Sequence, residues 1–107
     1  MVGDHPMTAY CIFIDSVCEG KIPAWRSEGG RFLLHATERE AQLAIADDIM
    51  EKLRQFQVGE RDFEDAIAIE DYIEPVSVRG DGIFCDLEGN SYGPSEILEP
   101  VEQPALP

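Results

Sequence analysis

The sequence predicts a small α+β domain in which one long helix packs on one face of an antiparallel sheet of about four strands. The length of 107 residues suits one compact domain. A capped amphipathic pattern of about twenty residues, typical of a helix, occupies the middle of the chain. Short β-branched and aromatic runs stand on both sides of it. The expected order is therefore β-β-α-β-β, with a short helical segment after the long helix.

Two apolar runs before the helix are expected to supply the first strands. Residues 10–14 are β-branched and aromatic, and their unbroken apolar character predicts burial on both faces, as at the centre of a sheet. Residues 15–30 contain three glycines and a proline and are expected to form a long loop. A second short strand is predicted over residues 31–35. Cys11 and Cys85 lie in strand-like stretches and are expected to be reduced thiols that pack as small hydrophobic residues.

The strongest local signal is a helix over residues 38–57. Thr37 and Glu40 match a capping box, in which the Thr37 hydroxyl accepts a hydrogen bond from the Glu40 amide and the Glu40 carboxylate accepts one from the Thr37 amide. Gly59 provides a C-terminal stop. Apolar residues spaced three or four positions apart form one stripe, which is expected to face the sheet. The stripe consists of Ala41, Ile45, Ile49, Leu53 and Phe56, widened by Ala46 and Met50.

The chain after the helix is predicted to hold one or two helical turns within residues 60–69 and then a hairpin. Pro75 donates no hydrogen bond, which places the strand over residues 72–79 at a sheet edge, or Pro75 at its start or in a bulge. Residues 83–87 are expected to return as the hairpin partner, and Tyr92 to pack back on it. The apolar face beneath the helix is expected to come from Ile12, Ile14, Phe32, Leu34, Val76, Val78 and Phe84.

The predicted domain covers residues 9–93. Residues 1–8 are expected to be a flexible N-terminus, and residues 94–107, with four prolines, a mobile extended tail. No secretory signal and no apolar run of about 20 residues is visible, so we expect a cytoplasmic protein without a membrane span.

Acidic side chains dominate the chain, with 22 Asp and Glu against 8 Lys and Arg, a net charge of −14. This charge repels phosphate, so direct binding to nucleic acid or to an anionic membrane is not expected. The expected partner is a protein with a basic surface. The alternative is that the acidity only keeps the domain soluble.

The acidic residues are densest after the helix, where seven acidic residues and one arginine lie between Glu60 and Glu74. We therefore expect a binding surface there, joined by carboxylates of the helix. Trp25 beside Arg26 is a candidate anchor, because Trp and Arg are enriched at binding hot spots; alternatively Trp25 seals one end of the core. The candidate acidic surface consists of Asp47, Asp48, Glu51, Glu60, Asp62, Glu64, Asp65, Glu70 and Asp71.

These observations favour a non-enzymatic binding or regulatory and inhibitory module, of a size and acidity typical of small bacterial and phage proteins. A narrower version is a DNA mimic that inhibits a nucleic-acid-binding protein. A Cys/His-dependent enzyme using Cys18 and His35 is an alternative from another class, disfavoured because nearby carboxylates oppose a thiolate. A homo-oligomeric structural module is a further alternative. No metal-ligand spacing is present, so neither a metal nor another cofactor is expected.

Overall fold

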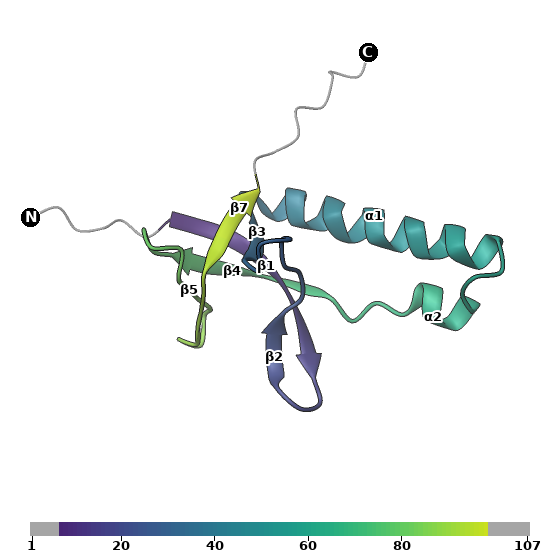
Figure 1. Ribbon diagram of the computed structural model, residues 1–107, viewed down its shortest axis with the longest axis horizontal. Coiled ribbons are helices and arrows are strands. Elements are labelled where there is room, and N and C mark those ends of the chain that lie inside the picture. The colour runs from purple at the N-terminus through teal and green to yellow at the C-terminus, as the bar shows by residue number, and fades with distance from the viewer. Residues whose placement is uncertain (1–6, 99–107) are drawn as a thin grey trace, which may run out of the picture.

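The computed structural model describes residues 7–98 and has the predicted α+β class, with two helices and seven strands (Figure 1). The first three strands are β1 (Met7–Ser16), β2 (Gly20–Pro23) and β3 (Phe32–His35). The helices are α1 (Glu38–Gln57) and α2 (Phe63–Ile67). The last four strands are β4 (Tyr72–Val78), β5 (Phe84–Cys85), β6 (Ser91–Tyr92) and β7 (Ser95–Leu98).

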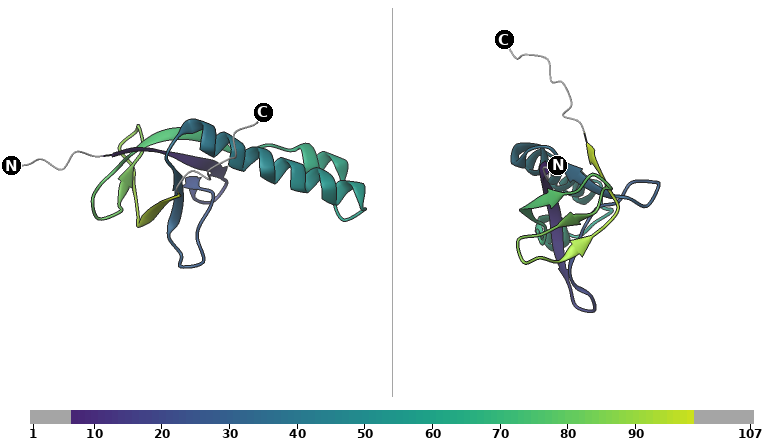
Figure 2. Two further views of the ribbon diagram at one scale, coloured as in Figure 1. Left: turned by 90° about the horizontal axis from the view of Figure 1, so that it is seen from above. Right: turned by 90° about the vertical axis from the view of Figure 1, so that its left-hand side faces the viewer.

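The sheet is mixed and strongly curved, whereas about four antiparallel strands were predicted (Figure 2). Its strand order is β6-β5-β4-β1-β3-β7, and β2 pairs with β1. All pairs are antiparallel except β3 with β7, which is parallel. The Ser95 amide and hydroxyl both donate to the Gly82 carbonyl, at 3.0 and 2.7 Å. This contact brings the start of β7 against the turn between β4 and β5, so the curved sheet nearly closes.

Two segments that were expected to be irregular form strands. Residues 20–23 lie within the predicted loop, but they pair with β1 as β2. Residues 95–98 lie within the predicted tail, but they pair with β3 as β7. Met7 and Thr8 likewise belong to β1 rather than to the flexible N-terminus. The rest of both predicted termini, residues 1–6 and 99–107, lies outside the described residues.

Strand β1 is buried on both faces, as its unbroken apolar run predicted. Cys11, Ile12 and Phe13 are all at most 2% exposed. Because side chains alternate along a strand, Cys11 and Phe13 point to one face and Ile12 to the other. The main core lies on the face of Cys11 and Phe13 and also contains Ala9, Leu34, Val76, Val78 and Phe84.

The predicted apolar face is therefore correct for some residues and wrong for others. Leu34, Val76, Val78 and Phe84 are buried together, but on the concave side of the sheet, away from α1. Ile12 is buried on the opposite face, and Ile14 is only half-buried. Phe32 packs at the margin of the main core. The curvature of the sheet explains the difference, because a sheet that nearly closes encloses a core of its own.

Aromatic side chains fill the concave side. The Tyr92 ring stacks on Phe84 at a centroid distance of 5.4 Å and lies 5.6 Å from the ring of Phe13. Tyr92 thus packs back on the hairpin as predicted. Burial raises the pKa of the nearby Cys11 thiol to about 12, which keeps it protonated. Cys85 is only half-buried, and all three cysteines are free.

Helix α1 has the predicted bounds, and its first turn is capped. The Thr37 hydroxyl accepts a hydrogen bond from the Glu40 amide at 3.1 Å. The reciprocal bond from the Thr37 amide to the Glu40 carboxylate is not formed within residues 7–98. The expectation that the whole apolar stripe faces the sheet was wrong. Ala41 is buried, but Ile49 and Leu53 are half-buried and Phe56 is 40% exposed.

The direction of α1 explains this exposure. The helix starts close to the end of β3 and contacts β1, β3 and β4, but it then runs away from the sheet rather than along it. The N-terminal part of α1 therefore lies over the sheet and its C-terminal part projects beyond it (Figures 1 and 2).

A tight reversal after α1 places α2 against the projecting end. The amides of Gly59 and Glu60 donate to the carbonyls of Phe56 and Gln55, at 3.1 and 2.8 Å. This is the Schellman pattern, and Gly59 occupies its left-handed position with φ of 84°. Helix α2 then packs on α1 through the buried Ala66. The predicted helical turns within residues 60–69 are thus confirmed.

Pro75 occupies a stretch of β4 that is paired on one side only. β1 pairs with β4 along its whole length, with Tyr10 opposite Pro75. β5 pairs with β4 only at Ser77 and Val78. The C-terminal end of β4 therefore lies between β1 and β5, whereas at Pro75 only β1 is paired with it. This free side explains how the sheet tolerates a residue that lacks an amide donor.

Replacing Gly59 tests the reversal that creates the α1–α2 arrangement. A Cβ at Gly59 would have no heavy atom within 4 Å, so Gly59→Ala is penalised only by the left-handed backbone. We expect the free energy of unfolding to fall by about 1 kcal/mol in urea titrations. Gly29→Ala is the matched control, because Gly29 has no positive φ and would meet only ordinary contact. Equal effects of the two substitutions would contradict this account of the turn.

Candidate functional site

All nine carboxylates of the predicted acidic surface lie on one projecting part of the molecule. We call this part, residues 47–71, the helical hairpin; it comprises the second half of α1, the turn, α2 and the segment that leads to β4 (Figure 1). Helix α1 carries Asp47, Asp48 and Glu51, the turn carries Glu60 and Asp62, α2 carries Glu64 and Asp65, and the last segment carries Glu70 and Asp71.

The helical hairpin is much more acidic than the rest of the molecule. Its 25 residues hold nine acidic and three basic side chains, a net charge of −6. The other 67 described residues hold ten acidic and five basic side chains, a net charge of −5. The negative charge per residue is thus about three times higher on the helical hairpin than on the other described residues.

The three cations of the helical hairpin are all engaged by neighbouring carboxylates. Lys52 pairs with Asp48 at 3.2 Å, Arg54 pairs with Glu51, and Arg61 pairs with Asp65. Six carboxylates remain that have no ion-pair partner among residues 7–98. They are Asp47, Glu60, Asp62, Glu64, Glu70 and Asp71, and all except the half-buried Asp71 are exposed.

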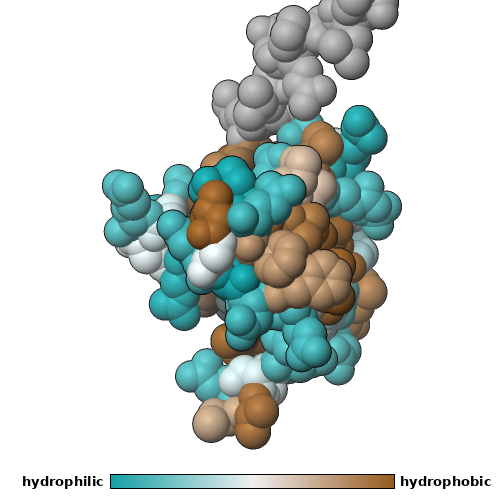
Figure 3. All heavy atoms as spheres, turned by 90° about the vertical axis from the view of Figure 1, so that its right-hand side faces the viewer, coloured by the Kyte–Doolittle hydropathy of each residue, from teal (hydrophilic) through white to brown (hydrophobic). Residues whose placement is uncertain are grey.

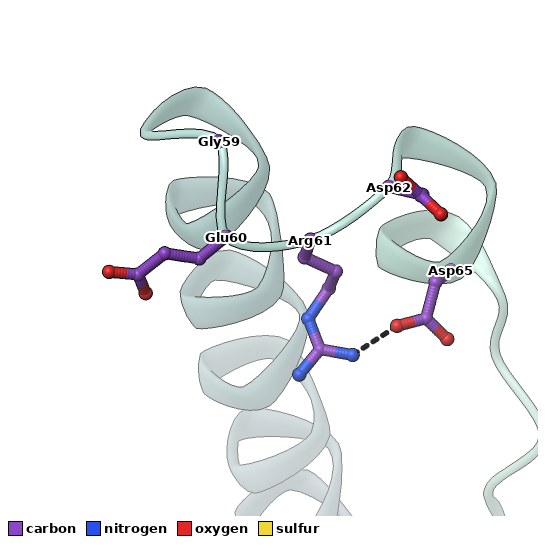
Figure 4. Close-up of a pocket in the computed structure, with 5 residues that line it drawn as sticks. All are labelled: Gly59, Glu60, Arg61, Asp62 and Asp65. Atoms are coloured by element: carbon purple, nitrogen blue, oxygen red, sulfur yellow. Dashed lines mark hydrogen bonds and ion pairs between the residues drawn. The ribbon is translucent and has the colours of Figure 1, made fainter.

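Arg61 also fixes the position of α2 relative to α1. Its Nε donates to the Gln55 Oε1 of α1 at 2.7 Å, while its Nη1 donates to Asp65 of α2. Figure 4 shows the Arg61 side chain directed at Asp65 and the Glu60 carboxylate directed away from both. These residues line a shallow polar hollow with Gly59 and Asp62. The acidic side chains of α1 and α2 are therefore carried by two helices that the hydrogen bonds of Arg61 hold together.

A second shallow hollow lies between α1 and the segment after α2. It is lined by Lys52, Asp65, Ala68, Glu70 and Asp71. Burial raises the pKa of Asp71, an effect that Lys52 opposes and that Asp48 and Glu70 strengthen. Among residues 7–98, no group of three or more His, Cys, Asp or Glu side chains is arranged to hold a metal ion. What this surface can do chemically is attract cationic groups.

Trp25 and Arg26 do not join the acidic surface. The Trp25 side chain is half-buried, and its ring lies edge-on to the imidazole of His35 in β3, at 6.3 Å. The Arg26 guanidinium lies over the ring of Phe32, at 4.6 Å. Both side chains thus pack against β3, which favours the alternative that Trp25 seals one end of the core.

Cys18 and His35, the pair that a cysteine-dependent enzyme would use, are not brought together. His35 pairs with Tyr10 in the β1–β3 register. Cys18 lies beyond Ser16, the last residue of β1. The six residue-to-residue steps along the strand from Tyr10 to Ser16 span about 20 Å. Cys18 is exposed, whereas His35 is buried, so the two side chains form no nucleophile–base pair.

An ion-pair cluster around the part-buried Lys21, on the sheet, was not predicted from the sequence. The Lys21 ammonium lies 2.6 Å from Glu74, 3.0 Å from Asp86 and 3.2 Å from Glu88. It also lies over the ring of Phe13, at 4.6 Å from the centroid. The partners are far from Lys21 in sequence, and no local spacing signals the cluster.

Asp86 is the most buried carboxylate of this cluster, and its side chain has no exposed surface. It accepts hydrogen bonds from the amides of Glu88 and Asn90, both at 2.9 Å, and from the Tyr92 hydroxyl at 3.2 Å. Burial by itself would raise the pKa of Asp86, but the hydrogen bonds from Asn90 and Lys21 hold that pKa well below its usual range. One cation against three carboxylates leaves the cluster with a net charge of −2, but the buried Asp86 has both a cation and backbone hydrogen bonds, so we assign the cluster a structural role.

Removing the Lys21 charge tests that role. Lys21→Met leaves Asp86 buried without a cation, so we expect the free energy of unfolding to fall by about 3 kcal/mol. Lys52→Met removes a cation whose partner Asp48 is 41% exposed in its side chain, and it should cost less than about 1 kcal/mol. Urea titrations of both variants measure the difference. Similar losses would show that the Lys21 cluster is no more important than a surface pair.

The pH dependence of stability tests the burial of His35. His35 is 5% exposed, and its Nε2 has no hydrogen-bond partner among the described residues. Burial lowers the pKa of His35, with Glu40 opposing that shift. The neutral form therefore stabilises the fold above the unfolded pKa of about 6.5, and this stability is lost as the pH falls below it. Urea titrations at successive pH values should show the loss, and His35→Gln should flatten it; an unchanged slope would contradict the assignment.

Comparison with protein families, with known proteins and with solved structures shows no significant match to this chain. Within residues 7–98, neither helix has the length and apolar character needed to cross a membrane. The function therefore has to be inferred from the chemistry of the surface itself.

Proposed function

We propose that this protein is a non-enzymatic binding or regulatory module that presents the helical hairpin to a protein with a basic surface. The observation that carries the proposal is the concentration, on one projecting element of net charge −6, of six carboxylates that have no ion-pair partner within residues 7–98. Acidity that served solubility alone would not have to gather there, because charge anywhere on the surface keeps a protein in solution.

The distribution of charge has an energetic disadvantage for the isolated molecule. Burial is the main cause of the raised pKa of Asp71, and the neighbouring carboxylates of Asp48 and Glu70 raise it further by repulsion. A cationic partner would relieve this repulsion. Because Arg61 and the Gly59 turn hold the two helices in place, the partner would meet charges that are already positioned and would lose little free energy to ordering them.

Charge on a projecting element is suited to fast, steered association. Complementary fields raise association rates by about 10–1,000-fold at low ionic strength, and the effect is lost as salt screens exposed charges. The proposal therefore implies binding that depends strongly on salt. If the basic surface of the partner is also the partner's functional site, binding of this protein would inhibit the partner.

Mimicry of DNA remains a narrower form of this proposal. It requires a partner whose basic groove normally holds nucleic acid, and it predicts that the protein competes with duplex DNA for that groove. A competition experiment between the protein and duplex DNA would distinguish this form from binding to any other basic surface.

Charge reversal at matched positions tests the proposed function. Glu64→Lys with Glu70→Lys reverses two carboxylates of the helical hairpin that have no ion-pair partner among the described residues. Asp65 is avoided because it holds Arg61. The control, Glu19→Lys with Glu28→Lys, changes the net charge equally at exposed positions outside the helical hairpin. At low ionic strength, we expect the first pair to slow association with poly-L-lysine about tenfold, and the control to slow it much less.

Surface plasmon resonance measures both association rates, and far-UV circular dichroism checks that both variants are folded. The difference should disappear near 1 M ionic strength, where the screening length is about 3 Å. Equal slowing by the two double variants would mean that only the total charge matters, and the proposed surface would be wrong.

A further inference from the structure

The helical hairpin also exposes apolar side chains. Of the ten large hydrophobic residues that are exposed among residues 7–98, six lie between residues 50 and 69, and each is at least 40% exposed. They are Met50, Phe56, Val58, Phe63, Ile67 and Ile69. Scattered surface hydrophobic residues are ordinary, but a gathering on one element marks an interaction site.

The geometry of the two helices joins several of these side chains into one surface. The rings of Phe56 in α1 and Phe63 in α2 meet edge to face at 5.2 Å. Ile67 lies one turn after Phe63 on the same side of α2, and Leu53 and Ile49 precede Phe56 along the α1 stripe. We call these five residues the apolar face of the helical hairpin. Figure 3 looks at this end of the molecule and shows hydrophobic side chains gathered among hydrophilic ones.

The short length of α2 explains why this surface is open. Helix α2 has five residues and extends about 8 Å, so it covers only a fraction of the projecting half of α1. Two helices also bury each other on one side only. Leu53 and Ile49 are half-buried, and Phe63 and Ile67 are 51% and 48% exposed. The arrangement is that of a helical bundle that lacks a third helix.

We propose that the third helix comes from a partner protein, as an amphipathic helix with an apolar side and with Lys or Arg along its margins. This inference rests on the proposed function and specifies the chemistry of the basic partner. Helix-in-groove recognition uses apolar anchors at positions i, i+3, i+4 and i+7 of the bound segment. The apolar face supplies the surface for such anchors, and Glu64, adjacent to Phe63, supplies a negative charge at its margin.

Charge argues against a second copy of the chain as the occupant. Two apolar faces in contact would bring together two helical hairpins of net charge −6 each. Like charges opposed across an interface disfavour association, whereas a cationic helix would pair with the same carboxylates. The apolar face and its acidic margin therefore favour a cationic amphipathic helix as the ligand.

A pair of designed peptides tests the inference. The first is an 18-residue helix of leucine and lysine with leucine at positions i, i+3, i+4 and i+7; the second has the same composition in scrambled order. Calorimetric titration into the full chain should show that the amphipathic peptide binds at least tenfold more tightly. Ile67→Ser should remove most of that preference, whereas Val17→Ser, an exposed hydrophobic residue in the β1–β2 turn, should leave it unchanged.

Ile67 is the preferred position because it takes no part in the Phe56–Phe63 contact, so its replacement leaves the aromatic contact between the helices intact. Equal affinity for both peptides would overturn the inference while leaving the proposed function in place. Failure of both peptides to bind at low ionic strength would overturn both. A dimer in sedimentation equilibrium that Ile67→Ser dissociates would identify a second copy as the occupant and would also overturn the inference.

Discussion

Strand β1 constrains the position of every other part of the sheet, because it is buried on both faces and pairs with β2, β3 and β4. One of its faces places Cys11 and Phe13 in the main core, which the curved sheet closes around. Its other face leaves only a small area around Ile12 for a helix to cover. The first turns of α1 cover that area, and Ala41 is buried there. The rest of the helix extends beyond the sheet.

The projection of α1 separates the proposed binding surface from the main core. Helix α2 returns along α1 and covers part of its apolar stripe, while the Gly59 turn and Arg61 hold the pair together. The helical hairpin contributes no residue to the main core. Its surface can therefore carry excess negative charge and exposed apolar side chains without disturbing the packing on which the sheet depends.

Two groups of carboxylates differ in their surroundings, while others, among them Glu19, Glu28 and Glu96, lie outside both groups. Around Lys21, the carboxylates of Glu74, Asp86 and Glu88 are brought to one cation, and Asp86 is further satisfied by backbone amides. These carboxylates share one cation of the fold itself. On the helical hairpin, six carboxylates have no ion-pair partner among the described residues, and five of them are exposed. This contrast, rather than the total charge of −14, directs attention to the helical hairpin.

The sequence by itself determined α1, because the Thr37 cap, the periodic apolar stripe and the Gly59 stop act between residues that are neighbours in the chain. It also identified the nine carboxylates and the two-sided burial of β1. Only the tertiary structure decided that β2 and β7 are strands, since four-residue segments of weak pattern pair only where β1 and β3 offer an edge. The Lys21 cluster joins residues up to 67 positions apart, and the apolar stripe is exposed because α1 runs away from the sheet. Both depend on contacts between distant segments, which local pattern does not encode.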